Sequence, residues 1–94
     1  MRTIEYANAF KKDFKRVKAT PRHRPDVERL LTTALTLLAD DQPLPLHQRD
    51  HDLTGNWSGY RECHLKPDLL LIYRKLDADV LRVARLGSHS ELFG

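Results

Sequence analysis

The fold of this chain is decided by residues 60–86, which read YRECHLKPDLLLIYRKLDADVLRVARL. Apolar and polar side chains alternate over residues 60–65, which is typical of a half-buried strand. Residues 69–73 are continuously apolar, which indicates a central strand that is covered on both faces. Proline at the second position of a tight turn fits residues 66–68, and residues 80–86 predict another strand. The stretch therefore predicts an antiparallel meander of three strands.

A short strand and a first helix are predicted before this meander. In residues 2–6 the apolar Ile4 and Tyr6 alternate with the polar Thr3 and Glu5, which indicates a short strand. Asn8 is a suitable N-cap for a helix that runs to about Lys18. The apolar stripe of this helix consists of Phe10, Phe14 and Val17.

A second helix is predicted from Pro25 or Asp26 to just before Asp40. Its buried face consists of Val27, Leu30, Leu31, Ala34, Leu35 and Leu38. Two prolines follow it, so residues 41–50 are expected to form an extended connection.

The order of the elements predicts an α+β fold, βααβββ, with a short C-terminal helix. Ser88 and Glu91 have the spacing of a capping box, so the final helix is expected to carry His89 and Phe93. The two long helices should form a hairpin that packs on one face of a small antiparallel sheet. A chain of 94 residues can bury one modest core between two layers, so residues 1–94 are expected to form a single domain.

The composition excludes several classes of protein. Charged residues make up 31% and apolar residues 40%, which fits a soluble globular protein and not a disordered chain. The single cysteine, Cys63, excludes an intramolecular disulfide, and the alternation around it predicts a buried thiol and not a nucleophile. No stretch approaches the length of a membrane span, and no apolar signal segment begins the chain. We therefore expect a cytoplasmic protein without a membrane partner.

Basic residues are concentrated near the N-terminus. Residues 1–24 carry eight basic and two acidic side chains, a net charge of +6, whereas the other 70 residues carry −3. A basic block of this kind attracts phosphate or an acidic partner. We expect Lys11, Lys12 and Lys15 to contact a nucleic-acid substrate, with a solvated helix face as the alternative.

Side chains suited to phosphodiester cleavage lie where the predicted strands end and the turns begin. They are His51, His64, Asp68, Arg85 and His89. Imidazole can give or take a proton near neutral pH. Because His64 ends one predicted strand and Asp68 starts the next, we expect their side chains to be neighbours. His51 alone could be a solvated loop residue, but the set of five predicts acid–base chemistry on a phosphodiester.

A metal site is an alternative for the same residues. The set that could form an open zinc site is His51, His64, Asp68 and His89. No close-spaced ligand motif supports such a site. His47 and His51 are four residues apart, which on a helix would suggest a metal pair, but the nearby prolines argue against a helix there. His23 lies in a break rich in arginine and proline and is expected to be exposed.

Aromatic residues near the candidate site have two interpretations. Trp57 and Tyr60 lie in a glycine-flanked segment, where packing onto the sheet edge is favoured over stacking on a base. Phe93 lies close to the C-terminus and could either complete the core or stack on an unpaired RNA base.

Five motifs occur in the C-terminal half. They are Asp50-His51-Xaa-Leu53-Xaa-Gly55-Xaa-Trp57, Gly59-Tyr60-Arg61 with His64-Xaa-Xaa-Pro67-Asp68, Leu71-Ile72-Tyr73, Arg85-Xaa-Gly87-Xaa-His89 and Leu92-Phe93-Gly94. Together they resemble the YafQ-like toxins of bacterial type II toxin–antitoxin systems, within the RelE superfamily of ribosome-dependent mRNA endonucleases. The resemblance extends over the whole chain, although the N-terminal half matches mainly in pattern. It implies a microbial-ribonuclease-like fold, with helices on one face of the sheet and mRNA on the other.

The resemblance implies a toxin that cleaves translated mRNA on the ribosome, without a metal or other cofactor. The catalytic positions of the family fall on His51, His64, Asp68, Arg85 and His89, and its base-stacking position falls on Phe93. His89 would be the acid, and His51 or Asp68 the base. His64 would hold the phosphate or Asp68, and Arg85 would stabilise the charged phosphorane. Attack by a 2′-hydroxyl would exclude DNA as a substrate.

The resemblance also implies a cognate acidic antitoxin, expected to be dimeric and to have a DNA-binding half. We expect it along the helical face or over the groove between His51 and His89. The alternative is a non-catalytic toxin of the same fold that poisons DNA gyrase by binding. Such a protein would have no need of the histidines and the aspartate of the candidate site.

Overall fold

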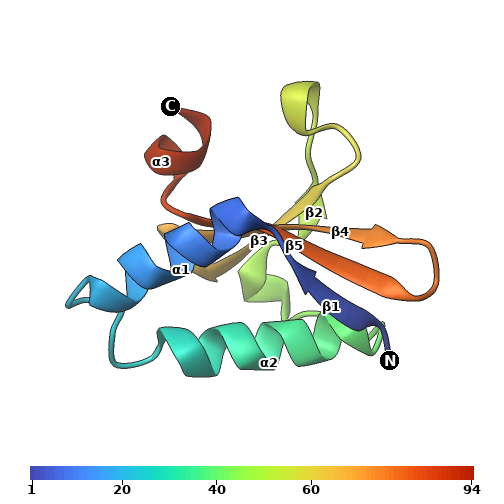
Figure 1. Cartoon of the computed structure of the whole chain (residues 1–94), viewed down its shortest axis with the longest axis horizontal. Coiled ribbons are helices and arrows are strands. Elements are labelled where there is room, and N and C mark those ends of the chain that lie inside the picture. The colour runs from blue at the N-terminus through green and yellow to red at the C-terminus, as the bar shows by residue number, and fades with distance from the viewer.

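The computed structural model describes all residues, 1–94, and contains a five-stranded sheet with two long helices on one side (Figure 1). The strands are β1 (Thr3–Tyr6), β2 (His51–Asp52), β3 (Arg61–Lys66), β4 (Leu69–Leu76) and β5 (Val80–Gly87). The helices are α1 (Asn8–Ala19), α2 (Val27–Ala39) and α3 (His89–Phe93), with 3-10 turns at Leu46–Gln48 and Gly55–Trp57. None of the helices has the length and the hydrophobicity that a membrane span requires. The predicted α+β fold is confirmed.

The strand order is β1-β5-β4-β3-β2, and the meander from β3 to β5 is antiparallel as predicted. β4 lies at the centre, and residues 69–73 are buried on both faces of the sheet. This explains why that segment has no charged residue.

The sheet differs from the prediction in the pairing of β1, which lies parallel to β5. Thr3 lies opposite Val80, and Tyr6 lies opposite Val83. An alternating pattern indicates a strand but carries no information on the direction of its neighbour, so the sheet is mixed and not purely antiparallel. β2 has two residues, which is too short for an alternating pattern to reveal.

One face of the sheet, here called the α2 face, packs against α1 and α2. Its core combines side chains of both helices and of three strands. They are Phe10, Val17, Val27, Leu31, Leu35 and Leu38 of the helices, and Cys63, Leu71, Tyr73, Leu81 and Val83 of the strands. Cys63 is fully buried, and this burial raises the pKa of its thiol to about 12. The prediction of a buried thiol is therefore confirmed.

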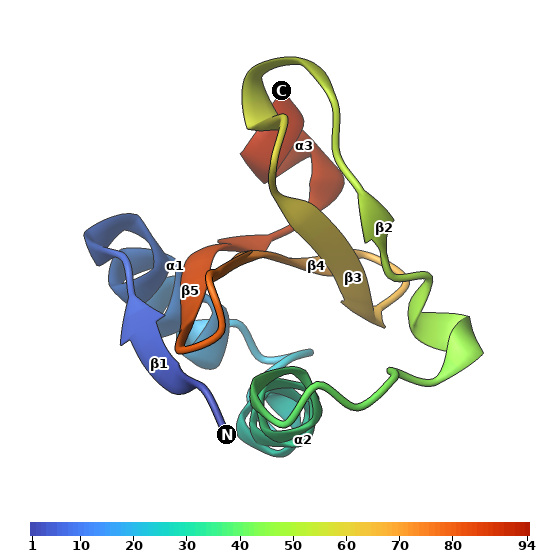
Figure 2. The same ribbon diagram turned by 90° about the vertical axis from the view of Figure 1, so that its right-hand side faces the viewer.

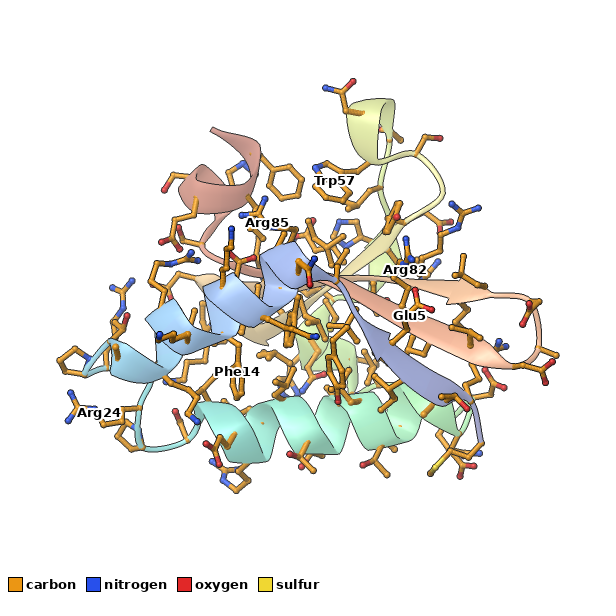
Figure 3. All side chains as sticks on the ribbon, in the orientation of Figure 1. Glu5, Phe14, Arg24, Trp57, Arg82 and Arg85 are labelled. Atoms are coloured by element: carbon orange, nitrogen blue, oxygen red, sulfur yellow. The ribbon has the colours of Figure 1, made fainter.

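The opposite face, here called the α3 face, carries α3 and the connection between β2 and β3 (Figures 1 and 2). A smaller apolar cluster lies on it, formed by Leu70, Ile72, Ala84 and Leu92 with the partly buried Leu53, Trp57, Tyr60 and Phe93. The rings of Trp57 and Tyr60 meet edge to face at 5.3 Å. Figure 3 shows the Trp57 side chain extending over this face towards α3. Packing at the sheet edge, as predicted for this pair, is confirmed.

The helix starts have different causes. Ala7, and not Asn8, occupies the N-cap position of α1, and no side chain caps this helix. The Ala7 amide donates to the Val83 carbonyl (3.0 Å), so strand pairing determines where α1 begins. At α3 the predicted capping box is present: Ser88 Oγ accepts from the Glu91 amide (3.2 Å), and the Glu91 carboxylate accepts from the Ser88 amide (2.8 Å).

The connection between α1 and α2 folds onto the turn between β3 and β4. Lys66 donates to the Arg22 carbonyl (2.9 Å) and pairs with Asp26 (2.8 Å). These contacts enclose His23, which is only 5% exposed. The prediction that His23 is exposed is therefore wrong. Burial, together with the positive charges of Lys66 and Arg22, lowers the pKa of His23. The error arose because the contacts come from a segment more than 40 residues away.

Candidate active site

The register of the sheet aligns a row of residues across the α3 face. His51 lies opposite Glu62, Glu62 lies opposite Ile72, and Ile72 lies opposite Arg85. Adjacent strands are about 4.8 Å apart, so the row extends over roughly 14 Å from β2 to β5. Residues that are distant in the sequence are therefore placed side by side, with an apolar residue in the middle.

A second row lies two residues further along the strands. His64 lies opposite Leu70, and Leu70 lies opposite Gly87, where β5 ends. α3 begins at His89 directly afterwards. His64 therefore lies about two strand spacings (roughly 10 Å) from Gly87 in the backbone, and His89 follows Gly87 by two residues.

Glu62 is a carboxylate placed between two histidines. Its Oε1 lies 3.3 Å from His64 Nε2, and its Oε2 lies 3.6 Å from His51 Nε2. The Glu62 side chain is 8% exposed, whereas that of His51 is 51% exposed. Glu62 was not among the residues predicted from the sequence, although its spacing to His64 indicates a shared face. Residues two apart on a strand lie on the same face, and Glu62 precedes His64 by two.

The backbone determines the tautomer of His51. His51 Nδ1 lies 2.6 Å from the Arg49 carbonyl oxygen. A carbonyl oxygen only accepts, so Nδ1 carries the hydrogen and the neutral ring has its lone pair on Nε2. Arg49 follows the turn Leu46–Gln48 in the left-handed conformation (φ 54°, ψ 44°). The connection predicted to be extended over residues 41–50 is thus interrupted by a turn that orients His51.

Asp50 anchors the start of β2. It accepts hydrogen bonds from the buried Tyr73 hydroxyl and from Arg61 Nε (3.3 Å). Burial and the Asp50 carboxylate both raise the pKa of Tyr73, which stays protonated as a donor. Arg61 also pairs with Asp52 (2.6 Å), so the residues on both sides of His51 are bound to the same guanidinium.

Arg85 is held by a buried carboxylate that sequence analysis also missed. Asp13 accepts from Arg85 Nε (2.6 Å) and Nη2 (3.2 Å), from Arg16 Nη1 (2.9 Å) and from the Leu86 amide (3.0 Å). Burial alone would raise the pKa of Asp13, but the hydrogen bonds from Arg85, Leu86 and Arg16 outweigh it and lower the pKa. A guanidinium has five N–H groups, so Arg85 retains donors on its Nη1 side. Figure 3 shows Arg85 beside α1, below α3.

Arg16 connects this network to α3. Arg16 Nε lies 3.1 Å from Glu91 Oε2, and Glu91 caps the helix that carries His89 and Phe93. A Cβ at Gly87 would lie 3.0 Å from both the Arg16 guanidinium and the Glu91 carboxylate, so glycine leaves room for this ion pair. The His89 and Phe93 rings are 5.0 Å apart. Phe93 is partly buried against the apolar cluster, which leaves part of its ring exposed.

Asp68 lies outside the two rows. It is in the turn between β3 and β4, is exposed, and pairs with Arg22 (3.1 Å). Sequence analysis expected Asp68 beside His64, but the carboxylate that contacts His64 is Glu62.

Three of the four lysines of α1 are exposed and form no ion pair: Lys11, Lys12 and Lys15. The fourth, Lys18, pairs with Glu28 (2.9 Å). Lys11 lines a groove of about 510 Å³ between α1 and α2, together with Tyr6, Phe10 and Phe14. This groove is on the helical side of the sheet, so the structure does not bring Lys11 together with the histidines.

The residues of the zinc alternative are not gathered into one ligand set. Asp68 is bound to Arg22, His89 is on α3, and only the other two histidines share a partner, Glu62. No group of three or more His, Cys, Asp or Glu side chains has an arrangement that could hold a metal ion. His47 is in a 3-10 turn and not on a common helix with its neighbour in β2.

The chain is similar to known toxins in both sequence and structure. The family described as "Bacterial toxin of type II toxin-antitoxin system, YafQ" matches residues 2–94. The mRNA interferase toxin YafQ of Escherichia coli (strain K12) is 43% identical over 93 residues, covering 99% of this chain and 97% of that protein. A chain in the crystal structure of the E. coli DinJ-YafQ complex has a TM-score of 0.83 at 41% identity, with 100% of both chains covered. A metal-bound toxin from Helicobacter pylori has a TM-score of 0.84 at 45% identity, covering 99% of this chain and 100% of that one.

Proposed function

We propose, because the chain belongs to the YafQ family of toxins of bacterial type II toxin–antitoxin systems, that the two rows on the α3 face are the active site of an mRNA interferase. The observation that supports this assignment is the strand register, which aligns His51, Glu62 and Arg85 in one row with His64 in the next row. His89 follows the end of β5 by two residues. Imidazoles, a carboxylate and a guanidinium are the groups that acid–base cleavage of RNA requires. The protein is an endoribonuclease that inhibits translation, as the resemblance implied.

His51 is our candidate for the base. Its Nε2 lone pair removes the proton from the RNA 2′-hydroxyl, and the oxygen forms a bond to the adjacent phosphorus. The charge of the imidazolium produced is stabilised by the Glu62 carboxylate, which lies 3.6 Å away. Asp68, the other candidate for the base, is already paired with Arg22, so the geometry favours His51.

His89 is our candidate for the acid, since it begins α3 directly after β5, whereas His51 lies in β2, three strands away in the sheet. It donates a proton to the 5′-oxygen as the bond between that oxygen and phosphorus breaks, which leaves a 2′,3′-cyclic phosphate. Arg85 stabilises the charged phosphorane with the N–H groups that Asp13 does not use. His64 binds a phosphate oxygen, and no step is assigned to a metal or other cofactor.

Phe93 is our candidate for stacking on a base of the substrate. Its ring lies 5.0 Å from that of His89, so a stacked base would hold the neighbouring linkage close to the acid. The reaction needs a 2′-hydroxyl, so DNA is not a substrate. We place the reaction on the ribosome in the cytoplasm, because translated mRNA is found there. We treat residues 1–94 as one domain, since both apolar clusters lie on the same sheet.

The partner is a cognate antitoxin, as in the E. coli DinJ-YafQ complex. We propose that it is acidic and partly disordered, and that it dimerises through a DNA-binding half. The net charge of +6 over residues 1–24 and the unpaired lysines of α1 support an acidic partner. The groove between α1 and α2 offers apolar surface to a segment that folds on binding. Co-expression with the neighbouring open reading frame should restore growth and yield a complex that survives gel filtration. An absence of any neutralising neighbour would contradict this proposal.

Mapping of RNA 5′ ends after brief induction tests the function as a whole. We expect new ends that are phased with codons and confined to translated messages. Cleavage without regard to reading frame would contradict the dependence on ribosomes. DNA breaks without new RNA ends would instead support the gyrase-binding alternative, which no feature of the α3 face favours.

A further inference from the structure

A cleft of about 320 Å³ lies beside His64, at the C-terminal end of β3. Its lining consists of His47, Arg49, His64, Leu65, Lys66 and Pro67. The majority of these side chains are basic and none is acidic. His64 also contacts Glu62, so the cleft and the candidate active site share one wall. In Figure 2 the light green segment with the turn Leu46–Gln48 lies at the right, beyond the edge of the sheet formed by β2 and β3.

The positive charge of the cleft is not fully neutralised within the protein. Lys66 pairs with Asp26 (2.8 Å). Arg49 is exposed, and its guanidinium forms no ion pair and no hydrogen bond. A free guanidinium beside an active site for RNA is suited to a phosphate group, whose oxygen atoms match its planar array of donors.

The backbone of Arg49 is a second and independent indication. Arg49 has φ 54°, and the other non-glycine residues with positive φ are Asp41 and Asp77. Aspartate adopts this region more readily than arginine, and glycine or asparagine is the usual choice after a helical turn. The carbonyl that orients His51 would be available with any of these residues. The geometry of the turn therefore does not explain why residue 49 is an arginine. Backbone strain at such positions is typical of functional sites.

We propose that this cleft binds a backbone phosphate of the RNA next to the cleaved linkage, with Arg49 as its main ligand and His47 and Lys66 as further contacts. This inference rests on the proposed function. Arg49 then has two tasks: its carbonyl orients His51, and its guanidinium holds the RNA strand beside His64. An acidic antitoxin segment is the other anion that could enter. RNA is favoured because the cleft shares His64 with the candidate active site.

A double substitution cycle between protein and RNA tests this inference. Wild type and Arg49→Gly would be compared in single-turnover cleavage on ribosomes programmed with mRNA. One mRNA is unmodified, and the others carry a neutral methylphosphonate at the linkage on either side of the cleaved one. Glycine keeps the left-handed backbone that orients His51 and removes only the side chain. Arg29→Gln is the matched control, since Arg29 is exposed on α2 without an ion pair.

For wild type, one methylphosphonate should raise the half-saturating toxin concentration about tenfold, which is the order expected for one charge-assisted contact. Arg49→Gly should show a similar loss on unmodified mRNA and no further loss on the modified one, because the two changes remove the same contact. Arg29→Gln should behave as wild type. The melting temperature of Arg49→Gly should stay near that of wild type, and Arg49→Asn is the substitute if the glycine variant does not fold.

Additive losses at both linkages would overturn the inference, as would equal losses for Arg49→Gly and Arg29→Gln. A weaker antitoxin complex with unchanged cleavage would assign the cleft to the antitoxin and overturn it as well. If wild type does not cleave the unmodified mRNA on ribosomes, the proposed function itself fails. If wild type cleaves but shows no coupling to Arg49, only the inference about the cleft fails.

Discussion

The two faces of the sheet use the same strands in different ways. Leu71 points to the α2 face, where it is fully buried in a core of 16 residues. Its neighbour Ile72 points to the α3 face, where it separates Glu62 from Arg85 in the row of polar residues. On the first face, shape and apolar area determine what each position tolerates. On the second, hydrogen bonds from outside the strands hold each functional group, so stability and chemistry can be tested separately.

The two faces are not completely independent, because α1 takes part in both. Its apolar stripe packs into the core of the α2 face, and Asp13, from the same helix, reaches Arg85 and Leu86 of β5. Through Arg16 and Glu91 the same helix also contacts α3. Substitutions in α1 should therefore affect both properties.

The largest effect is expected for His89→Ala on the α3 face. Loss of a positioned acid typically reduces the rate by about 10² to 10⁴. His89 is exposed, so the free energy of unfolding should change by less than about 0.5 kcal/mol. Growth inhibition and thermal unfolding of the variant measure the two properties. A folded variant that is as toxic as wild type would remove His89 from the mechanism.

Leu71→Ala should show the opposite pattern. Truncation of a fully buried leucine in the central strand should lower the free energy of unfolding by about 2–5 kcal/mol. Leu71→Met, which conserves volume, should cost less than about 1.5 kcal/mol. Denaturant unfolding measures this cost, and cleavage per folded molecule should stay unchanged. A rate loss like that of His89→Ala would show that the two faces cannot be separated.

Asp13→Asn should lower stability less than Leu71→Ala and should lower the cleavage rate less than His89→Ala. The loss of an ionised acceptor for Arg85 should destabilise the fold by about 1–3 kcal/mol and slow cleavage about tenfold, since each misplaced charge contact weakens phosphorane stabilisation. Because the folded-state pKa of Asp13 is lowered, its stabilising effect is complete above its ordinary pKa and is lost as the pH falls through the folded value. Urea unfolding at pH 7 and in acid should show a smaller acid loss in the variant than in wild type.

Asp79→Asn is the matched control, since Asp79 is exposed in the turn between β4 and β5. If that variant loses as much as Asp13→Asn, the role assigned to the buried network is contradicted.

The smallest effect is expected for removal of metal ions from the purified protein. A preparation treated with chelator and then returned to ribosomes in magnesium buffer should cleave mRNA at an unchanged rate. Elemental analysis should find no stoichiometric zinc or copper. The test matters because a similar toxin from H. pylori is metal-bound. One equivalent of metal per chain, with activity lost on its removal, would favour a metallohydrolase.

Local patterns explain which parts of the structure could be predicted from the sequence. The meander follows from alternation and from an apolar run, and the capping box follows from two residues three apart. The histidines were identified as candidates because imidazole can transfer a proton near neutral pH and because they lie where predicted strands end and turns begin. Each of these signals lies within a few neighbouring residues.

Long-range contacts explain what could not be predicted. Asp13 contacts Arg85, which is 72 residues away in the sequence. No local pattern in a lysine-rich helix indicates that one of its carboxylates is buried. The direction of β1 depends on the path of the whole chain between β1 and β5. Glu62 could have been identified from its spacing to His64. Its position between two histidines depends on the pairing of β2 with β3, which places His51 opposite Glu62.

The central claim is that the α3 face has a base in β2 and an acid in α3. A change of the leaving group tests this claim most directly. An mRNA with sulfur in place of the 5′-oxygen at the cleaved linkage has a leaving group that needs little protonation, since thiols are far more acidic than alcohols. Single-turnover cleavage on programmed ribosomes should show that this mRNA removes most of the defect of His89→Ala and leaves the defect of His51→Ala unchanged. Rescue of His51→Ala, or no rescue of His89→Ala, would contradict the account.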